Sequence, residues 1–149
     1  MISDPRATDR LWYAFAISSV ITVAVLAISP VKDYFREYRS YQSAYRKLLI
    51  DTAGSAKDLR AAESQAVAIR QYWLEDLGNH VDRCTSCHLG VDNPRMSHAQ
   101  EPFRAHPVTP HTPGDFQRFG CTVCHRGQGR ATSLAEAHGD VPDWDRPLL

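Results

Sequence analysis

The sequence lacks the features that would indicate a nucleic-acid-binding protein or a conventional enzyme. Its formal net charge is zero, and from Val81 to the end it contains seven arginines, no lysine and eight acidic residues. Without an excess of positive charge, the chain has no basic stripe to attract a phosphate backbone. It also shows no Ser-His-Asp set, no catalytic pair of carboxylates and no phosphate-binding loop. We therefore expect neither nucleic-acid binding nor catalysis by protein side chains.

No cysteine lies outside two short motifs, Cys84–His88 (CTSCH) and Cys121–His125 (CTVCH). Both fit Cys-x-x-Cys-His, the attachment pattern of c-type haem, in which each thiol forms a thioether and the histidine binds the iron. Each motif is followed by a glycine two residues later, which suggests a duplicated unit. The sequence predicts two covalent haems, held by Cys84, Cys87, Cys121 and Cys124, with His88 and His125 as iron ligands.

Three other uses of the cysteines stay open at this point. Two Cys-x-x-Cys pairs could form a four-thiolate zinc site, although zinc ribbons usually separate their pairs by about 15 to 20 residues. Here residues 88–120 intervene, and zinc has no need of a histidine after each pair. A redox dithiol usually accompanies a βαβ pattern, which is not visible. Structural disulfides fit a chain outside the cytosol.

The N-terminal region contains the one long hydrophobic run. Residues 11–28 carry no charge and would span about 27 Å as a helix, enough for the hydrocarbon core of a membrane. A cleaved signal peptide would have a shorter apolar run and a small-residue cleavage site, whereas Ser29 is followed by Pro30. We predict a single transmembrane anchor in residues 1–30.

Two arguments about orientation disagree. Haem is attached on the outer side of the bacterial cytoplasmic membrane, so the part after the anchor should face the periplasm. The positive-inside rule predicts the reverse, because two arginines precede the apolar run and five basic residues follow it by Lys47. We give precedence to the haem chemistry.

Residues 31–79 are predicted to be a helical stalk. Ser29 and Pro30 have the pattern of a helix start, and tyrosines then recur at helical spacing up to Tyr45. This seam is most simply a packing surface, with a quinone site or an electron relay as the alternative. After a break at residues 51–54, Ser55 would begin a second helix that ends at Gly78, and the two would form an antiparallel hairpin. A continuous, kinked stalk is the other possibility.

Residues 80–149 are expected to form a largely irregular dihaem cytochrome c domain. Seven of the nine prolines lie in this region, which disfavours long helices and regular sheets. A segment of about 70 residues rarely builds a stable apolar core alone, whereas bound haem supplies a large apolar body. The predicted fold class is mainly α: a transmembrane helix, a helical stalk and this domain.

The sixth ligand of each iron decides between electron transfer and chemistry on a small molecule. We predict His106 and His138 as these distal ligands, with His138 able to return over the second haem. The remaining candidates are His111, His98, His80 and Met96. Arginines near the motifs are predicted to pair with haem propionates, and aromatic residues to pack on the macrocycles. These residues are Arg83, Arg95, Arg104, Arg118, Arg126 and Arg130, and Phe103, Phe116, Phe119 and Trp144.

The two motifs make the chain resemble multihaem c-type cytochromes. Residues 119–132, together with residues 137–139, resemble a group of membrane-anchored bacterial multihaem cytochromes that work beside cytochrome b or other quinol-oxidising partners. The resemblance covers residues 80–149, while the anchor and hairpin match only in layout. It implies two haem c cofactors, a respiratory or photosynthetic complex in the inner membrane as partner, and a periplasmic electron carrier or oxidase as acceptor.

Three functions follow as hypotheses. The first is an electron-transfer subunit that passes single electrons from a quinol-oxidising partner and is not itself an enzyme. The second is a haem enzyme, such as a peroxidase or nitrogen-oxide reductase, with one open iron. The third is a module without haem that holds zinc. The visible spectrum and the intact mass distinguish them.

Overall fold

The computed structural model of the chain describes residues 5–107 and 116–149. The chain divides into two compact units, Met1–Phe35 and Arg36–Leu149. The first unit consists of one long helix, and the second contains all four cysteines.

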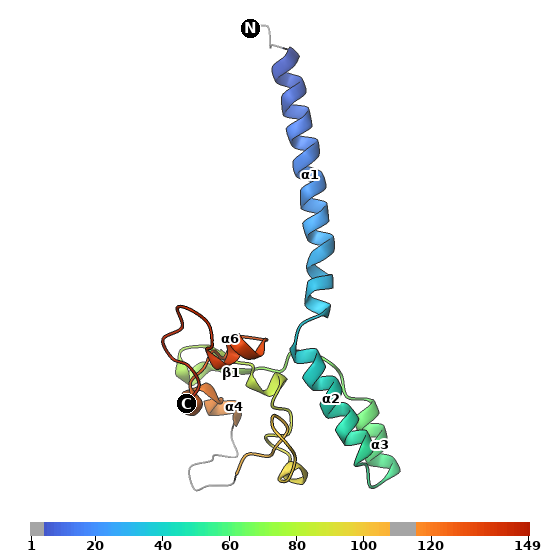
Figure 1. Cartoon of the computed structure of the whole chain (residues 1–149), viewed down its shortest axis with the longest axis vertical. Coiled ribbons are helices and arrows are strands. Elements are labelled where there is room, and N and C mark those ends of the chain that lie inside the picture. The colour runs from blue at the N-terminus through green and yellow to red at the C-terminus, as the bar shows by residue number, and fades with distance from the viewer. Residues whose placement is uncertain (1–4, 108–115) are drawn as a thin grey trace. The chain divides into compact units, whose positions relative to one another are not determined.

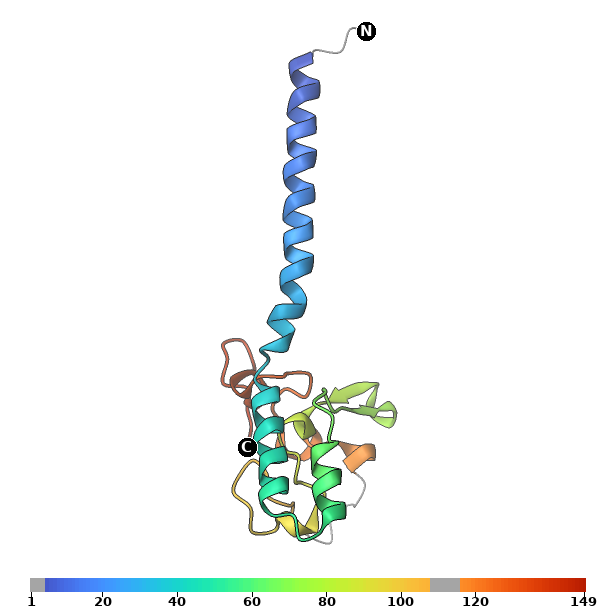
Figure 2. The same cartoon turned by 90° about the vertical axis from the view of Figure 1, so that its right-hand side faces the viewer.

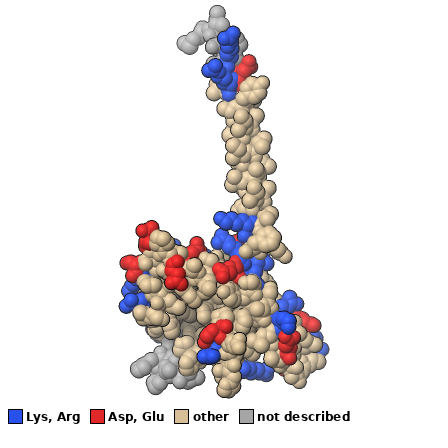
Figure 3. All heavy atoms as spheres, viewed as in Figure 1, with Lys and Arg blue, Asp and Glu red and all other residues tan. Residues whose placement is uncertain are grey.

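The first unit is built on helix α1 (Pro5–Tyr34), seen in Figures 1 and 2. Its apolar side chains are exposed, as Leu11 at 71% and Val20 at 70% show. The hydroxyl groups of Ser18, Ser19 and Thr22 donate to helix carbonyls 2.8–2.9 Å away. Figure 3 shows an uncharged middle with charged residues near the helix ends. In the described part of the chain, one helix is thus long and apolar enough to cross a membrane.

The end of α1 differs from the sequence prediction. Ser29 and Pro30 were expected to start a new helix, but α1 continues through Pro30 to Tyr34. Proline's fixed φ angle is compatible with a helix, although inside one it removes a backbone donor and is a cause of kinks. The interruption falls at residues 35–37, and the next helix begins at Tyr38.

The second unit begins with two packed helices, α2 (Tyr38–Asp51) and α3 (Ala56–Glu63). Figures 1 and 2 show them side by side and antiparallel, and the Arg46 guanidinium donates to the carbonyl of Glu63 at 2.6 Å. The Ser55 hydroxyl accepts the backbone N–H of Asp58 at 3.1 Å and donates to its carboxylate at 2.7 Å. The predicted hairpin and its capping pair are both present.

The second helix of the hairpin is shorter than the apolar spacing predicted. It was expected to reach Gly78, but α3 ends at Glu63, and residues 65–71 have no regular secondary structure. Gly78 instead ends a 3₁₀ turn with a φ of 75°, a left-handed conformation that glycine adopts at no steric cost. The prediction of a long second helix was wrong.

Side chains elsewhere in the unit explain this early end. The side-chain amide of Gln42 donates to the Ala68 carbonyl at 2.7 Å and accepts the Ala68 N–H at 2.9 Å. The Ser86 hydroxyl donates to the Arg70 carbonyl at 2.8 Å and accepts its N–H at 2.9 Å. These bonds satisfy backbone groups that a helix would otherwise pair, so tertiary contacts outweigh the helical periodicity.

The remainder of the unit consists of short elements joined by irregular chain. Strands β1 (Tyr72–Leu74) and β2 (His80–Asp82) pair antiparallel, with Tyr72 opposite Asp82. The other short elements are η1 (Glu75–Leu77), η2 (Cys84–Ser86), η3 (Pro94–Met96), α4 (Phe116–Phe119), α5 (Thr122–His125) and α6 (Leu134–His138). The described residues of this region are therefore largely irregular, as the proline content predicted.

The buried core of the second unit is small. One cluster consists of Tyr45, Leu89 and Met96, at 3%, 4% and 6% exposure. Tyr38 and Tyr45 of the predicted tyrosine seam are both buried at 3%, so the seam is a packing surface at these positions.

Candidate functional site

The two Cys-x-x-Cys-His motifs form the same helical turn. In the first, the N–H groups of Cys87 and His88 both donate to the carbonyl of Cys84, at 3.1 and 2.9 Å. In the second, Cys124 and His125 donate to the corresponding Cys121 carbonyl at 3.2 and 3.0 Å. Residues three and four apart on a helical turn share one face. Each motif thus presents two thiols and an imidazole together.

The four thiols do not gather around one point. All four cysteines are free. Among the residues that the structure describes, the one His, Cys, Asp and Glu group close enough to share a metal ion is Asp82, Cys84 and Cys121, whose ligand atoms lie within 4.8 Å of one another. Cys87 and Cys124 are outside this group, so the geometry does not match a four-thiolate zinc site.

The thiols of the first motif are held in their protonated form. A hydrogen bond with Cys121, burial and the charge of Asp82 raise the pKa of Cys84 far above its ordinary value. Burial, with a smaller contribution from Glu37, raises the pKa of Cys87 to about 11. A reactive dithiol requires a thiolate, which positive surroundings would favour. These surroundings do the opposite.

Asp82 links the two motifs, and sequence reasoning missed it. Its side chain is 0% exposed. One carboxylate oxygen accepts the N–H of Cys84 at 3.1 Å, and the other accepts the N–H groups of Cys121 and Thr122 at 2.7 and 2.9 Å. Burial favours the neutral acid, but these backbone donors outweigh it and lower the pKa of Asp82. An aspartate side chain that accepts the N–H two residues further on forms a common turn, and this was the one available signal.

Each motif histidine faces a second histidine. The ring centroids of His88 and His138 are 6.4 Å apart, and those of His125 and His106 are 6.0 Å apart. His106 and His138 are the two predicted distal ligands. His138 lies beside the histidine of the first motif, whereas the sequence suggested that it could return over the second. The second motif is instead faced by His106, from the segment between the motifs, so the chain crosses between the sites.

These spacings are compatible with two imidazoles that would bind one metal ion. With metal–nitrogen bonds of about 2 Å, the two nitrogens lie about 4 Å apart and the ring centroids on the order of 6 Å apart. His106 Nδ1 lies 2.9 Å from the Pro107 carbonyl, and an N–H donated there leaves Nε2 for the metal. Burial is the largest cause of the lowered pKa of His88, which favours the neutral, ligating form.

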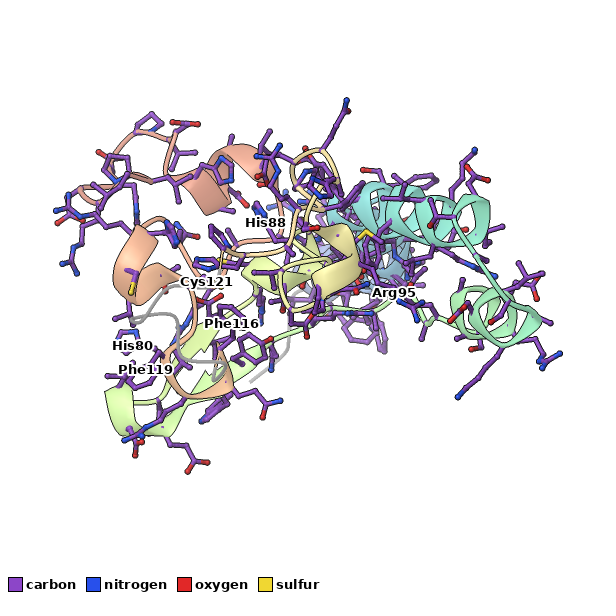
Figure 4. All side chains as sticks on the ribbon, turned by 90° about the horizontal axis from the view of Figure 1, so that it is seen from below. His80, His88, Arg95, Phe116, Phe119 and Cys121 are labelled. Carbon is purple, nitrogen blue, oxygen red and sulfur yellow. The ribbon has the colours of Figure 1, made fainter. Side chains whose placement is uncertain are left out.

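The other candidate ligands lie away from these pairs. His80 is exposed on β2, and His98 is exposed just after η3. Met96 is 6% exposed and packs in the core with Tyr45 and Leu89. His111 lies outside the described residues. In Figure 4, His88 and Cys121 lie in the middle of the unit, whereas His80 lies toward one edge of it.

The arginines near the motifs have varied partners. Arg83 bonds to the side chain of Gln71 and the carbonyl of Arg130. Arg95, Arg104 and Arg118 form exposed ion pairs. Arg95 lies toward the helical hairpin in Figure 4. These three guanidinium groups therefore already have carboxylate partners. None of the ion pairs among the described residues involves Arg83, Arg126 or Arg130, which are the remaining candidates for propionates.

The predicted aromatic residues also differ in their surroundings. Phe116 lies next to His106, with ring centroids 5.6 Å apart. Phe103 packs on Tyr45 at 5.4 Å, and Arg118 lies over the ring of Phe119. The Trp144 indole donates to the Arg146 carbonyl at 2.8 Å. Of the four, Phe116 contacts a predicted iron ligand.

No protein-family model, curated protein or solved structure matches this chain. The class of protein must therefore be inferred from its own residues.

Proposed function

We propose that the chain is a membrane-anchored dihaem cytochrome c that transfers single electrons within a larger complex. One observation carries this proposal: each Cys-x-x-Cys-His motif presents its histidine to a second histidine, with ring centroids 6.0 and 6.4 Å apart. The attachment motif and the imidazole pair share the motif histidine, and the second histidine of each pair comes from outside the motif. Both occur twice in the chain.

The residues divide into two haem sites. Cys84 and Cys87 would hold the first haem, and Cys121 and Cys124 the second. His88 with His138, and His125 with His106, would bind the two irons. When bound, the haem iron supplies reversible one-electron oxidation and reduction. The protein supplies attachment, ligand orientation and the surroundings that set the potential.

The paired histidines favour a carrier over a haem enzyme. An enzyme acting on peroxide or a nitrogen oxide needs an open iron position. Here each motif histidine has a second imidazole nearby that would occupy the sixth position, which supports a carrier. The predicted peroxidase or reductase activity has no comparable support.

Membrane location and partners complete the proposal. Helix α1 would anchor the chain in the cytoplasmic membrane of a bacterium, with the second unit in the periplasm where haem is attached. Electrons would come from a quinol-oxidising, cytochrome b-like subunit and pass to a periplasmic carrier or oxidase. The uncharged length of α1 and the resemblance of residues 80–149 to anchored multihaem cytochromes support this arrangement.

The test is the intact mass and the spectrum of the full chain, purified from a bacterium with haem-attachment machinery. We expect a mass excess of two haems and an electron paramagnetic resonance (EPR) spectrum of low-spin ferric iron alone. A mass equal to the polypeptide would overturn the proposal. A high-spin component that binds cyanide would instead select the haem enzyme.

A further inference from the structure

A buried carboxylate lies between the two motifs and bonds to both. Asp82 ends strand β2 and is 0% exposed. Its Oδ1 accepts a hydrogen bond from the first motif, and its Oδ2 accepts three from the second, including one from the Thr122 hydroxyl at 3.1 Å. Removing a carboxylate from water is unfavourable unless hydrogen bonds replace its contacts with water. Here four donors bond to the Asp82 carboxylate.

Two glycines allow the backbone to approach Asp82 closely. At Gly120, whose φ is +65°, an added Cβ would lie 2.8 Å from Asp82 Oδ2 and 2.8 Å from Leu74 Cδ1. At Gly129 it would lie 2.7 Å from the Val81 carbonyl oxygen. The N–H of Arg83 donates to the Gly129 carbonyl at 2.8 Å. The backbone therefore lies close to Asp82 both just before the second motif, at Gly120, and after it, at Gly129.

This packing brings the first cysteine of each motif together. The sulfurs of Cys84 and Cys121 and a carboxylate oxygen of Asp82 all lie within 4.8 Å of one another. A thioether sulfur is bonded directly to a vinyl-derived carbon of haem. Haems bound at Cys84 and Cys121 would therefore be attached to the protein at neighbouring points.

The charge on Asp82 is not balanced by a cation among the described residues. None of the ion pairs between these residues involves Asp82, and its four partners are neutral dipoles. A negative charge in a buried site acts strongly on nearby charges, because little water screens it. Oxidised haem carries one more positive charge than reduced haem, so this carboxylate stabilises the oxidised form.

We propose that Asp82 is a positioning residue shared by both haem sites: it holds Cys84 and Cys121 side by side, so that the two haems meet edge to edge, and its charge lowers both reduction potentials. This inference rests on the proposed function. It makes one residue, Asp82, responsible for how close the two haems lie, and the two motifs alone do not specify this closeness.

The first test compares Asp82→Asn with Asp145→Asn in the full chain. Both variants remove one carboxylate charge without changing size, and Asp145 is exposed. We expect redox titration to show both midpoint potentials raised by Asp82→Asn, and only a small change in Asp145→Asn. Equal shifts in the two variants would overturn the role of Asp82.

An asparagine has one acceptor oxygen, so it cannot accept hydrogen bonds from both motifs as Asp82 does. A second variant therefore tests the charge in case Asp82→Asn loses haem. Thr122→Val removes one donor to Asp82 but keeps its charge. The charge is then less neutralised, so we expect a lower potential, the opposite direction from Asp82→Asn. A potential that is unchanged or higher in Thr122→Val would overturn the electrostatic role.

The edge-to-edge arrangement has its own test in the wild-type protein. Two ferric irons in neighbouring haems interact magnetically, so the first haem should give a different EPR signal in the wild type than in Cys121→Ala/Cys124→Ala. Identical first-haem signals would overturn the arrangement. A wild-type mass without haem would overturn the proposed function itself, whereas a two-haem protein that fails these tests overturns only the role of Asp82.

Discussion

The two haem-attachment motifs have almost the same sequence but different surroundings. In the first, Thr85 and Ser86 are 6% and 1% exposed. In the second, the residue equivalent to Ser86 is Val123, which is 54% exposed, and Cys124 and His125 are exposed as well. The shared sequence pattern therefore determines the local turn, whereas contacts with the rest of the chain determine how deeply each motif is buried.

Different contacts explain this difference. The first motif is bound to the helical hairpin, because the Gln42 amide donates to the Ser86 carbonyl at 3.1 Å, and Ser86 in turn binds Arg70. The second motif is held at its start by Asp82 and at its end by the N–H of Leu149, which donates to the His125 carbonyl at 3.1 Å. The first motif is part of the core, and the second is attached to it.

The largest expected effect comes from removing one attachment site at a time. Cys121→Ala/Cys124→Ala should lose one haem and keep the other. Cys84→Ala/Cys87→Ala should lose most of both, because the first motif lies in the core of the second unit, where Thr85 and Ser86 are buried, and the haem expected to pack there is lost. Intact mass spectrometry of the purified chain gives the haem count directly.

Limited proteolysis provides a second measure of the same comparison. The variant without the first haem should be cleaved throughout the second unit, since loss of a core group exposes backbone to the protease. The variant without the second haem should be cleaved mainly after residue 120. Loss of one haem from each variant, with equal protection, would show that the two sites fold independently.

A smaller, local effect is expected from the histidine pairs. His138→Ala and His106→Ala should each leave one low-spin haem and convert the other to a high-spin form that binds cyanide. The exposed His98, which faces no motif histidine in the described structure, provides the control, and His98→Ala should leave both haems low-spin. Two low-spin haems in His138→Ala would contradict the pairing of His138 with His88.

Sequence reasoning predicted the local elements that depend on neighbouring residues. The apolar run predicted α1, the Ser55 and Asp58 spacing predicted the cap of α3, and the prolines predicted an irregular second half. It failed for residues 64–78, because Gln42 and Ser86 pair with that backbone from far along the chain. No periodicity within the segment carries this information.

The candidate site shows the same limit. The motifs indicated four cysteines and two histidines, and the choice of His106 and His138 stays a prediction that their ring positions support. Which histidine faces which motif could not be read from spacing, because the chain crosses between the sites. Asp82 was missed because a single aspartate gives no indication of burial until the fold encloses it.

The smallest predicted effect is a change in stability, compared at the equivalent residues Ser86 and Val123 of the two motifs. Ser86→Ala removes a hydroxyl that serves both backbone groups of Arg70, so two partly buried groups lose their partner. The free energy of unfolding should fall by about 1–3 kcal/mol. Val123→Ala at the equivalent exposed position should change it by about 0.5 kcal/mol or less. Urea unfolding of the haem-loaded chain measures both, and equal losses would mean that the first motif is no more part of the core than the second.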